Sequence, residues 1–329
     1  MKVLITGGTG FIGSRLALQL LEKGHTVTIL GQENNEAEAA NKHLVAAKGG
    51  KVVLASVTER EKIVSVLQGI DLVYHLAAAQ HEANVPDQKF WDVNVSGTEN
   101  VLQASVQAGV KRLIHGSTIG VYGTALEGQI DEQTALKPDN IYGITKREGE
   151  KLVRSFLDKL PAVIIRISET YGPGDRRLLK LFKAIKKKMF VMIGPGKNIH
   201  HLIYIDDLIA GFLLAASAEA AVGETFVLAG KDALTTNEMV AIIAEHLGSQ
   251  VPKMRAPLPL FLLLAATTET VLRPLGIQPP LHRRRMDFFK KSFVFSQQHA
   301  RTVLGFVPQY SFRQGVIATT QWYVEQGYL

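Results

Sequence analysis

The stretch KVLITGGTGFIG, at residues 2–13, decides the fold of this chain. Its first five residues are mostly apolar or β-branched, which is typical of a buried strand. Gly7, Gly10 and Gly13 then follow in a GxxGxxG pattern, and residues 14–23 have the spacing of an amphipathic helix. A strand, a glycine turn and a helix N-terminus together suit a pyrophosphate, because glycine permits close approach and the helix end offers free N–H groups. The stretch therefore predicts a dinucleotide site.

Strand-like and helix-like segments alternate through the first half of the chain. The predicted strands lie at residues 3–6, 26–30, 52–54, 72–76, 112–115 and 162–167. The longest helices between them are predicted at 93–107 and 142–160. This alternation predicts an α/β fold, namely a Rossmann-type doubly wound parallel sheet with helices on both faces. Ligands of such sheets bind beyond the carboxyl ends of the strands.

After about residue 174 the alternation becomes irregular and proline is more frequent. We therefore expect a nucleotide-binding Rossmann domain at 1–174 and a smaller, mostly helical substrate-binding lobe at 175–329. Parts of the chain after residue 200 can return to the sheet. The apolar stretch at 257–276 has a core too short to span a membrane. It fits a buried helix, a lid over an apolar substrate, or an interfacial helix backed by Arg283, Arg284 and Arg285.

Composition and charge narrow the classes of function. The chain has 329 residues, no cysteine and a formal net charge of +7. Without cysteine there is no disulfide, no thiolate nucleophile and no cysteine-based metal site. His200, His201 and Asp206 lack a recognisable ligand spacing, so no metal is expected. No nucleic-acid-binding module accompanies the positive charge, so no nucleic-acid partner is expected, whereas contact with a lipid surface is compatible with it.

The cellular location is predicted from the same features. A chain without cysteine fits a reducing compartment. A strand that begins at residue 2 leaves no room for a signal peptide before it. We therefore expect a cytoplasmic protein.

The stretch YGITK places Tyr142 and Lys146 four residues apart in a predicted helix. Four residues make about one helical turn, so both side chains project from the same face. A lysine ammonium near a phenol favours the phenolate and lowers the pKa of the tyrosine. Such a tyrosine suits proton exchange with an alcohol oxygen. The same spacing also occurs on solvated helix faces, and the glycine loop is what favours the catalytic interpretation.

Together these motifs resemble those of the short-chain dehydrogenase/reductase superfamily, in its extended branch. The resemblance runs nearly from end to end. Further similar segments are DLVYHLAA (71–78), NVSGTENVL (94–102), IHGSTIGVYG (114–123), RISETYGPG (166–174), IYIDDL (203–208), LGFVP (304–308) and WY (322–323). The run at 279–295 looks more like the 3β-hydroxysteroid dehydrogenase-like group than like the sugar-modifying members.

The resemblance implies a role for each residue of the site. Tyr142 would exchange the proton, Thr118 would hold the substrate oxygen, and Ser117 could share or replace that role. Lys146 would also hydrogen-bond the ribose of the nicotinamide. The residues implied to hold the cofactor are Gly7, Gly10, Phe11, Ile12, Gly13, Gln32, Ser56, Val57, Ala77, Ala78, Asn94, Tyr142 and Lys146. Asn94 could instead cap its helix.

The choice between NAD and NADP stays open. Gly31 stands where an NAD site usually has an acid, and Gln32 stands where an NADP site often has arginine. Glu33 could reach back to the ribose. Ser56 replaces the acid that is usual before Val57 in the branch.

Two positions bear on the substrate. Nucleotide-sugar enzymes of the branch commonly have Asn where this chain has Glu169, and Arg where it has His200. A carboxylate repels a diphosphate, and histidine is mostly neutral at pH 7. With the apolar stretch at 257–276, these differences predict an NAD(P)-dependent oxidoreductase that interconverts a secondary alcohol and a ketone on a hydrophobic, steroid-like or acyl, substrate.

Two other functions stay open beside this one. The first is a nucleotide-sugar 4-epimerase or dehydratase, and the second is a catalytically silent cofactor-binding protein. Relatives often dimerise through their two long helices. We therefore expect a homodimer built on a four-helix bundle of 93–107 and 142–160.

Overall fold

The computed structural model describes residues 1–80, 85–124, 128–272 and 283–329. Within these residues a central parallel sheet has seven strands, in the order β12–β7–β5–β4–β1–β2–β3. The strands are β1 (Lys2–Thr6), β2 (Thr26–Gly31), β3 (Lys51–Leu54), β4 (Leu72–His75), β5 (Arg112–Thr118), β7 (Ala162–Ile167) and β12 (Thr225–Leu228). Because β1 lies between β2 and β4, the strand order reverses there, and the glycine loop opens at this switch point.

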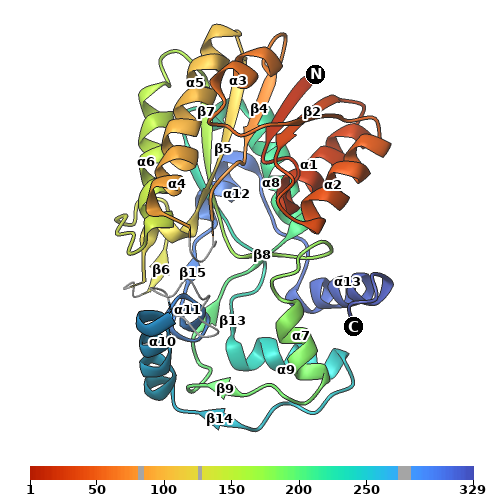
Figure 1. Cartoon of the computed structure of the whole chain (residues 1–329), viewed down its shortest axis with the longest axis vertical. Helices are drawn as coiled ribbons and strands as arrows, with labels where there is room; N and C mark the ends of the chain where they lie inside the picture. Colours follow the sequence, from red (N-terminus) through yellow and green to blue (C-terminus); the bar gives the residue numbers. More distant parts are fainter. Residues whose placement is uncertain (81–84, 125–127, 273–282) are drawn as a thin grey trace.

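Helices cover both faces of the sheet (Figure 1). One face is covered by α1 (Phe11–Glu22), α2 (Glu36–Ala47) and α8 (Ile205–Ser217). The other is covered by α3 (Arg60–Val66), α4 (Asp87–Trp91), a π-helical turn η1 (Asp92–Ser96), α5 (Gly97–Gln107) and α6 (Ile141–Ser155). The predicted α/β, doubly wound fold is therefore confirmed.

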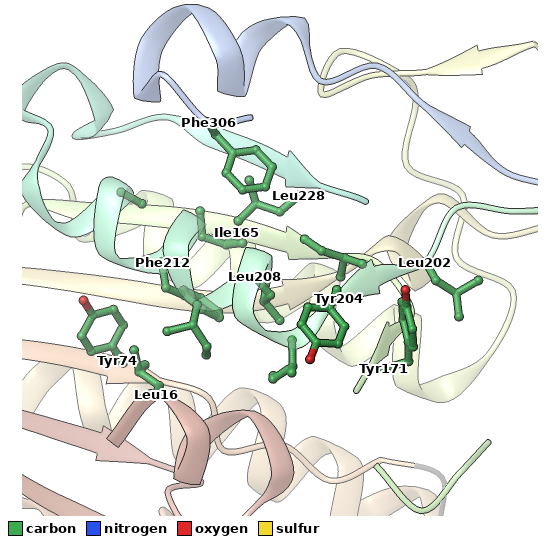
Figure 2. Packing of buried hydrophobic residues seen from close by; sticks show 14 of the residues in the cluster. Leu16, Tyr74, Ile165, Tyr171, Leu202, Tyr204, Leu208, Phe212, Leu228 and Phe306 are labelled. Carbon is green, nitrogen blue, oxygen red and sulfur yellow. The ribbon is translucent and has the colours of Figure 1, made fainter. Parts of the chain in front are cut away.

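Alternating strand residues divide the core between these two faces. Val3 and Ile5 of β1 belong to the cluster under α1 and α8, whereas Leu4 belongs to the cluster under α5 and α6. Figure 2 shows the first cluster, in which Phe212 of α8 meets Tyr74 of β4 edge to face at 6.0 Å between ring centroids. These apolar contacts thus hold α8, a helix from the second half of the chain, firmly on the sheet.

The rest of the second half forms a lobe beyond the carboxyl ends of the strands (Figure 1). Its helices are α7 (Leu179–Lys186), α9 (Thr236–His246), α10 (Leu258–Leu272), α11 (Arg283–Lys290) and α13 (Phe312–Glu325). Its short strands are β8 (Thr170–Tyr171), β9 (Met192–Ile193), β10 (Ile199–His200), β11 (Ile203–Tyr204), β13 (Leu234–Thr235) and β14 (Arg255–Ala256). β15 (Val294–Phe295) pairs with β6 (Gln129–Ile130), and α12 (Gln298–Leu304) lies against β12. The chain after residue 200 therefore builds both the lobe and one edge of the sheet.

The apolar stretch at 257–276 forms most of α10, and its residues 273–276 lie outside the described part of the chain. Ala265 is buried, while Leu260 and Leu263 are exposed. Residues 279–282 and the side chains of Arg283, Arg284 and Arg285 also lie outside the described part. Among the described residues, no helix is both long and apolar enough to cross a bilayer.

Candidate active site

A cleft of about 460 Å³ opens at the carboxyl ends of the strands, between the sheet and the lobe. A second hollow of about 350 Å³ shares the glycine loop with it and continues toward the ends of β2 and β3. Most of the residues that the sequence singles out line these two spaces. The residues on their walls are Gly7, Gly10, Phe11, Ile12, Gly13, Gln32, Ser56, Val57, Ala77, Ala78, Ser117, Thr118, Tyr142 and Glu169. Asn94, Lys146 and His200 are buried behind the walls.

The backbone of the glycine loop leaves an open space that the side chains of other residues would fill. Gly7 has a φ of 70°, and a Cβ there would lie 2.8 Å from the backbone nitrogen of Ala77. A Cβ on Gly13 would lie 2.3 Å from the carbonyl oxygen of Gly7. Gly10 is the N-cap of α1 and provides no side-chain cap, so the N–H groups of the first turn have no intrahelical partner. The loop therefore suits a pyrophosphate, which fits a dinucleotide.

Thr118 and Tyr142 reach the same cleft from two elements that touch closely. Thr118 ends β5, and its Oγ1 accepts a hydrogen bond from the N–H of Gly120 at 3.1 Å. Tyr142 is the second residue of α6, whose N-terminus approaches this turn. A Cβ on Gly143 would lie only 2.5 Å from the carbonyl oxygen of Gly120. Glycine at that position thus lets α6 bring Tyr142 to the wall that carries Thr118.

Lys146 lies one helical turn after Tyr142 and is almost fully buried. Its Nζ lies 3.5 Å from Nε2 of His115. Burial lowers the pKa of Lys146 to about 8, although the charge of Glu150 opposes that shift. Burial and the charge of Lys146 also keep the pKa of His115 well below its usual value, so this histidine stays neutral beside the ammonium. An ammonium in such a dry setting interacts strongly with neighbouring groups on its helix face.

Ser117 takes part in a buried polar cluster behind the cleft. Its hydroxyl donates to Glu150 Oε1 at 2.5 Å. Arg166 holds both oxygens of the same carboxylate, at 3.1 and 2.9 Å, and also donates to the hydroxyl of Tyr122. The Ser117 proton is thus directed at Glu150, whereas Thr118 lines the cleft as an acceptor from Gly120. Glu150 is not among the residues that the sequence predicts for the site, although it follows Lys146 by one helical turn on the same face.

Asn94 connects the loop after β4 to the helix that carries Tyr142. Its Oδ1 accepts from the N–H of Ala79 at 2.8 Å, and its Nδ2 donates to the carbonyl of Ala79 at 3.1 Å. The same Nδ2 donates to Thr145 Oγ1 at 3.0 Å. The side chain lies within the π-helical turn and fixes two walls of the cleft relative to each other, so it does not act as a helix cap.

Glu169 follows β7 and lines the cleft with its side chain about half exposed. Nδ1 of His200 donates to its Oε2 at 3.3 Å. Desolvation works against the charge of Glu169, but the hydrogen bond from His200 and the nearby charge of Arg177 outweigh it and lower its pKa. Arg176 and Arg177 line the same cleft. The cleft therefore carries an anion and two cations beside the position where substrate would lie.

Each of the three residues with side chains that could ligate a metal bonds to a different partner. His200 bonds Glu169, the ring of His201 bonds the carbonyl of Gly230, and Asp206 pairs with Arg15 at 3.0 Å. Within the described ranges, no group of three or more histidine, aspartate or glutamate side chains is placed to hold a metal ion.

Comparisons with known proteins place this chain in a family. The model of the NAD dependent epimerase/dehydratase family matches residues 3–229. The chain is 27% identical to the N-acetyl-alpha-D-glucosaminyl-diphospho-ditrans,octacis-undecaprenol 4-epimerase of Escherichia coli O157:H7, over 98% of this chain and 95% of that protein. It is 28% identical to the 3 beta-hydroxysteroid dehydrogenase/Delta 5-->4-isomerase of Mycobacterium tuberculosis, over 98% and 90%.

A solved structure agrees with this placement. The dTDP-glucose 4,6-dehydratase DesIV of Streptomyces venezuelae, a double mutant with NAD bound, has a TM-score of 0.82 and 26% identity to this chain. The likeness covers 100% of this chain and 98% of that one. Because the family model spans well over half of the residues, the chain belongs to the NAD dependent epimerase/dehydratase family, as the resemblance of its motifs implied.

Proposed function

We propose that this chain is an NAD-dependent oxidoreductase that interconverts a secondary alcohol and a ketone on a hydrophobic, steroid-like or acyl, substrate. The observation that carries the chemistry is that Thr118 and Tyr142 line one cleft, with Lys146 buried one helical turn behind Tyr142. The glycine loop would hold the pyrophosphate of NAD, and Ser56, Val57 and Ala77 would line its adenosine end. When bound, NAD supplies the chemistry of hydride transfer at its nicotinamide ring.

The protein residues handle the proton and the oxygen. The hydroxyl of Tyr142 exchanges a proton with the oxygen of the substrate. The hydroxyl of Thr118 hydrogen-bonds that oxygen and helps to hold it as charge develops. The ammonium of Lys146 favours the phenolate form of Tyr142 through its charge. Asn94 holds the helix of Tyr142 against the loop after β4, which keeps these groups aligned.

Glu169 supports a substrate without a diphosphate. Its carboxylate lies in the cleft wall, and His200 and Arg177 favour its charged form. A diphosphate bound in the cleft would lie near this carboxylate, and the two negative charges would repel each other. A hydroxyl of a steroid or acyl chain could instead donate a hydrogen bond to Glu169. The similarity to a 3 beta-hydroxysteroid dehydrogenase points in the same direction.

The test is turnover of a substrate panel by the purified chain. With NAD added, we expect NADH to form with 3β-hydroxysteroids or long-chain hydroxyacyl compounds, followed by absorbance. Under the same conditions UDP-sugars are expected to give neither NADH nor an epimer. Turnover confined to UDP-sugars would contradict the proposal.

The charge of Glu169 gives a sharper prediction. Replacing Glu169 by asparagine should tighten the binding of UDP by about tenfold or more, because it removes a repulsive charge from the cleft. Isothermal titration of the parent and variant with UDP measures this change. Glu245→Gln is the matched control, since Glu245 pairs with Arg313 on an exposed surface. Equal UDP affinity in parent and Glu169→Asn would remove the argument against a diphosphate.

A second candidate is a 4-epimerase acting on a diphosphate-linked sugar. Arg176 and Arg177 line the same cleft and offer cations for a diphosphate. The similarity to an epimerase of a lipid-linked diphosphosugar favours this candidate as well. Such an enzyme would keep its NAD through purification and would interconvert two sugars without net NADH. The retained cofactor and the absence of NADH separate it from the first proposal.

The second hollow predicts that NAD binds better than NADP. Glu38 lines both spaces, and its Oε2 accepts from the N–H of Asn34 at 2.7 Å. A carboxylate here repels the 2′-phosphate of NADP, while Lys42 is paired with Glu33 at 2.5 Å. We expect a dissociation constant about tenfold or more lower for NAD, measured by fluorescence titration.

Two variants test the source of that preference. Glu38→Gln should narrow the difference in affinity between the two cofactors, whereas Glu36→Gln, which changes an exposed carboxylate in the same first turn of α2, should not. A parent protein that prefers NADP would contradict the assignment.

We also propose that two copies associate through α5 and α6, which lie side by side on one face of the sheet. Light scattering on a sizing column at micromolar concentration should give the mass of two chains. The mass of one chain would contradict the proposal.

A further inference from the structure

Two histidines lie side by side on neighbouring strands of the sheet, behind the cleft. His75 of β4 and His115 of β5 stand opposite each other in the strand register, with their ring centroids 5.3 Å apart. Both side chains are fully buried. A buried imidazole loses its hydrogen bonds to water, so each ring nitrogen needs a partner within the protein. The two rings differ in how far this need is met.

His75 has a partner for each of its nitrogens. Its Nε2 lies 2.9 Å from Oγ1 of Thr98, and its Nδ1 lies 2.7 Å from Oγ1 of Thr6. Thr98 donates its own proton to the carbonyl of Asn94, so its oxygen accepts from the N–H at Nε2 of His75. The hydroxyl of Thr6 then donates to Nδ1. His75 is therefore a core histidine with both ring nitrogens satisfied.

Within the described residues, the ring of His115 has a single hydrogen-bond partner, which is Lys146. An ammonium can only donate, so Nζ of Lys146 donates to Nε2 of His115 at 3.5 Å. Nε2 must therefore carry the lone pair, and the proton of the neutral ring lies on Nδ1. That Nδ1 is the buried nitrogen without a partner.

This arrangement has a cost that packing does not explain. A buried N–H without an acceptor destabilises the folded chain. The other tautomer would be worse, because it would turn an N–H at Nε2 toward the ammonium of Lys146. A phenylalanine at position 115 would fill a similar space and leave no polar atom unsatisfied. The contact with Lys146 is thus the interaction that accounts for a histidine at this position.

The other groups around Lys146 leave this acceptor role to His115. Glu150, one helical turn later, favours the ammonium through its charge, but Arg166 holds both oxygens of that carboxylate. His75 stays neutral, because burial and the charge of Lys146 lower its pKa to about 3. Among the described residues, the buried titratable groups on the elements packed against this part of α6 are His75 on β4, His115 on β5, Tyr122 on the 3₁₀ turn η2 (Ile119–Tyr122) and Arg166 on β7.

We propose that His115 is a positioning residue for Lys146. By accepting one N–H of the ammonium, His115 holds Nζ in one direction and favours the charged form of the lysine. The remaining N–H groups are then available to Tyr142 and to the ribose of a bound cofactor. The effect on turnover rests on the proposed function, whereas the contact and the tautomer do not.

The first experiment determines the tautomer of His115 in the parent protein. Nitrogen NMR of the chain labelled at histidine distinguishes a protonated ring nitrogen from an unprotonated one. The signals that disappear in His115→Gln identify the ring. At about pH 7 we expect a protonated Nδ1 and an unprotonated Nε2. A proton on Nε2 would overturn the proposal, because that nitrogen could not accept from Lys146.

The second experiment follows the ionisation of Tyr142 in the absence of substrate. The absorbance of phenolate is titrated in each protein and in the same protein carrying Tyr142→Phe, and the difference belongs to Tyr142. His115→Phe removes the acceptor and so disfavours the ammonium of Lys146. The phenolate of Tyr142 should then form about half a pH unit or more above the parent. His115→Gln, whose side-chain carbonyl can accept in place of Nε2, should reverse most of this shift.

Leu113→Ala is the matched control for this titration. Leu113 is fully buried two residues before His115, on the same face of β5, so the change loosens the strand without removing an acceptor. It should lower the melting temperature and leave the ionisation of Tyr142 as in the parent. An unchanged ionisation in folded His115→Phe would overturn the proposal, as would an equal shift in Leu113→Ala. If His115→Phe does not fold, the tautomer of the parent decides.

Turnover separates this proposal from the proposed function. In the direction of alcohol oxidation, the rise of kcat with pH should move upward in His115→Phe together with the ionisation of Tyr142, while KM changes little. A rise that stays at the parent pH would count against His115 as a positioning residue. A parent with the expected tautomer and ionisation that oxidises no alcohol would contradict the proposed function and leave the role of His115 toward Lys146 intact.

Discussion

Replacing Tyr142 by phenylalanine is expected to lower kcat by about a hundredfold or more and to leave NAD affinity near that of the parent. The change removes only the hydroxyl, and the ring keeps its place on the cleft wall beside Gly120. Without the phenol, no group at this position can exchange a proton with the substrate oxygen. Steady-state turnover, together with a fluorescence titration of NAD, separates the loss of chemistry from a loss of binding.

Tyr310→Phe is the control for this prediction. Tyr310 is exposed and is not among the residues that line the cleft, so its hydroxyl should not affect turnover. Full activity of Tyr142→Phe would remove Tyr142 from the mechanism. A parent protein that binds NAD but turns over neither alcohols nor sugars would favour the catalytically silent alternative.

Breaking the buried pair of Glu150 and Arg166 should produce the largest loss of stability. Both side chains are almost fully buried, and Arg166 holds the carboxylate through two hydrogen bonds. Arg166→Met leaves the carboxylate of Glu150 buried without its countercharge. We expect the free energy of unfolding to fall by about 3–5 kcal/mol. Urea denaturation, with the midpoint and slope both fitted, measures the change.

The double variant distinguishes the ion pair from simple loss of packing. Glu150→Leu combined with Arg166→Met removes both charges and should recover much of the stability lost in Arg166→Met. Lys159→Met, which removes an exposed cation, should have little effect. If Arg166→Met stays within about 1 kcal/mol of the parent, the pair is not a main support of this region.

The strands were predictable where their residues are β-branched and continuous. The predicted segments 26–30 and 162–167 lie within β2 and β7, because apolar runs of that length fit a sheet buried on both faces. β5 runs on to Thr118 instead of ending at 115, because Ser117 and Thr118 keep pairing with β7. The sequence does not predict this extension of β5, because small and polar residues at the end of a strand are not typical of a strand.

Other boundaries depended on contacts distant in sequence. β12 is four residues long and joins the sheet only by pairing with β7, some sixty residues earlier. α1 begins at Phe11, before the predicted start at 14, because Gly13 lies inside the first turn of the helix. α6 ends at Ser155, before the predicted 160, where the chain turns toward β7.

The residues of the site were predictable from the sequence, but the hydrogen-bond partners of those residues were not. Spacing alone indicated that Tyr142 and Lys146 share a helix face, and both now lie at or directly behind the cleft. The sequence could not reveal that Glu150 engages Ser117, or that His200 engages Glu169. Those contacts join separate strands and helices, so only the folded chain brings them together.

The contact between Gly143 and Gly120 has a consequence for the cost of binding. Two backbones meet there without a side chain between them, so the distance between the backbones that carry Tyr142 and Thr118 does not depend on an intervening rotamer. A junction of this kind has little conformational freedom to lose when a ligand arrives. Folding therefore fixes the backbone geometry of the proton-exchange site before a ligand binds. Less of the binding free energy is lost in ordering the site, so more of it is available to discriminate between substrates.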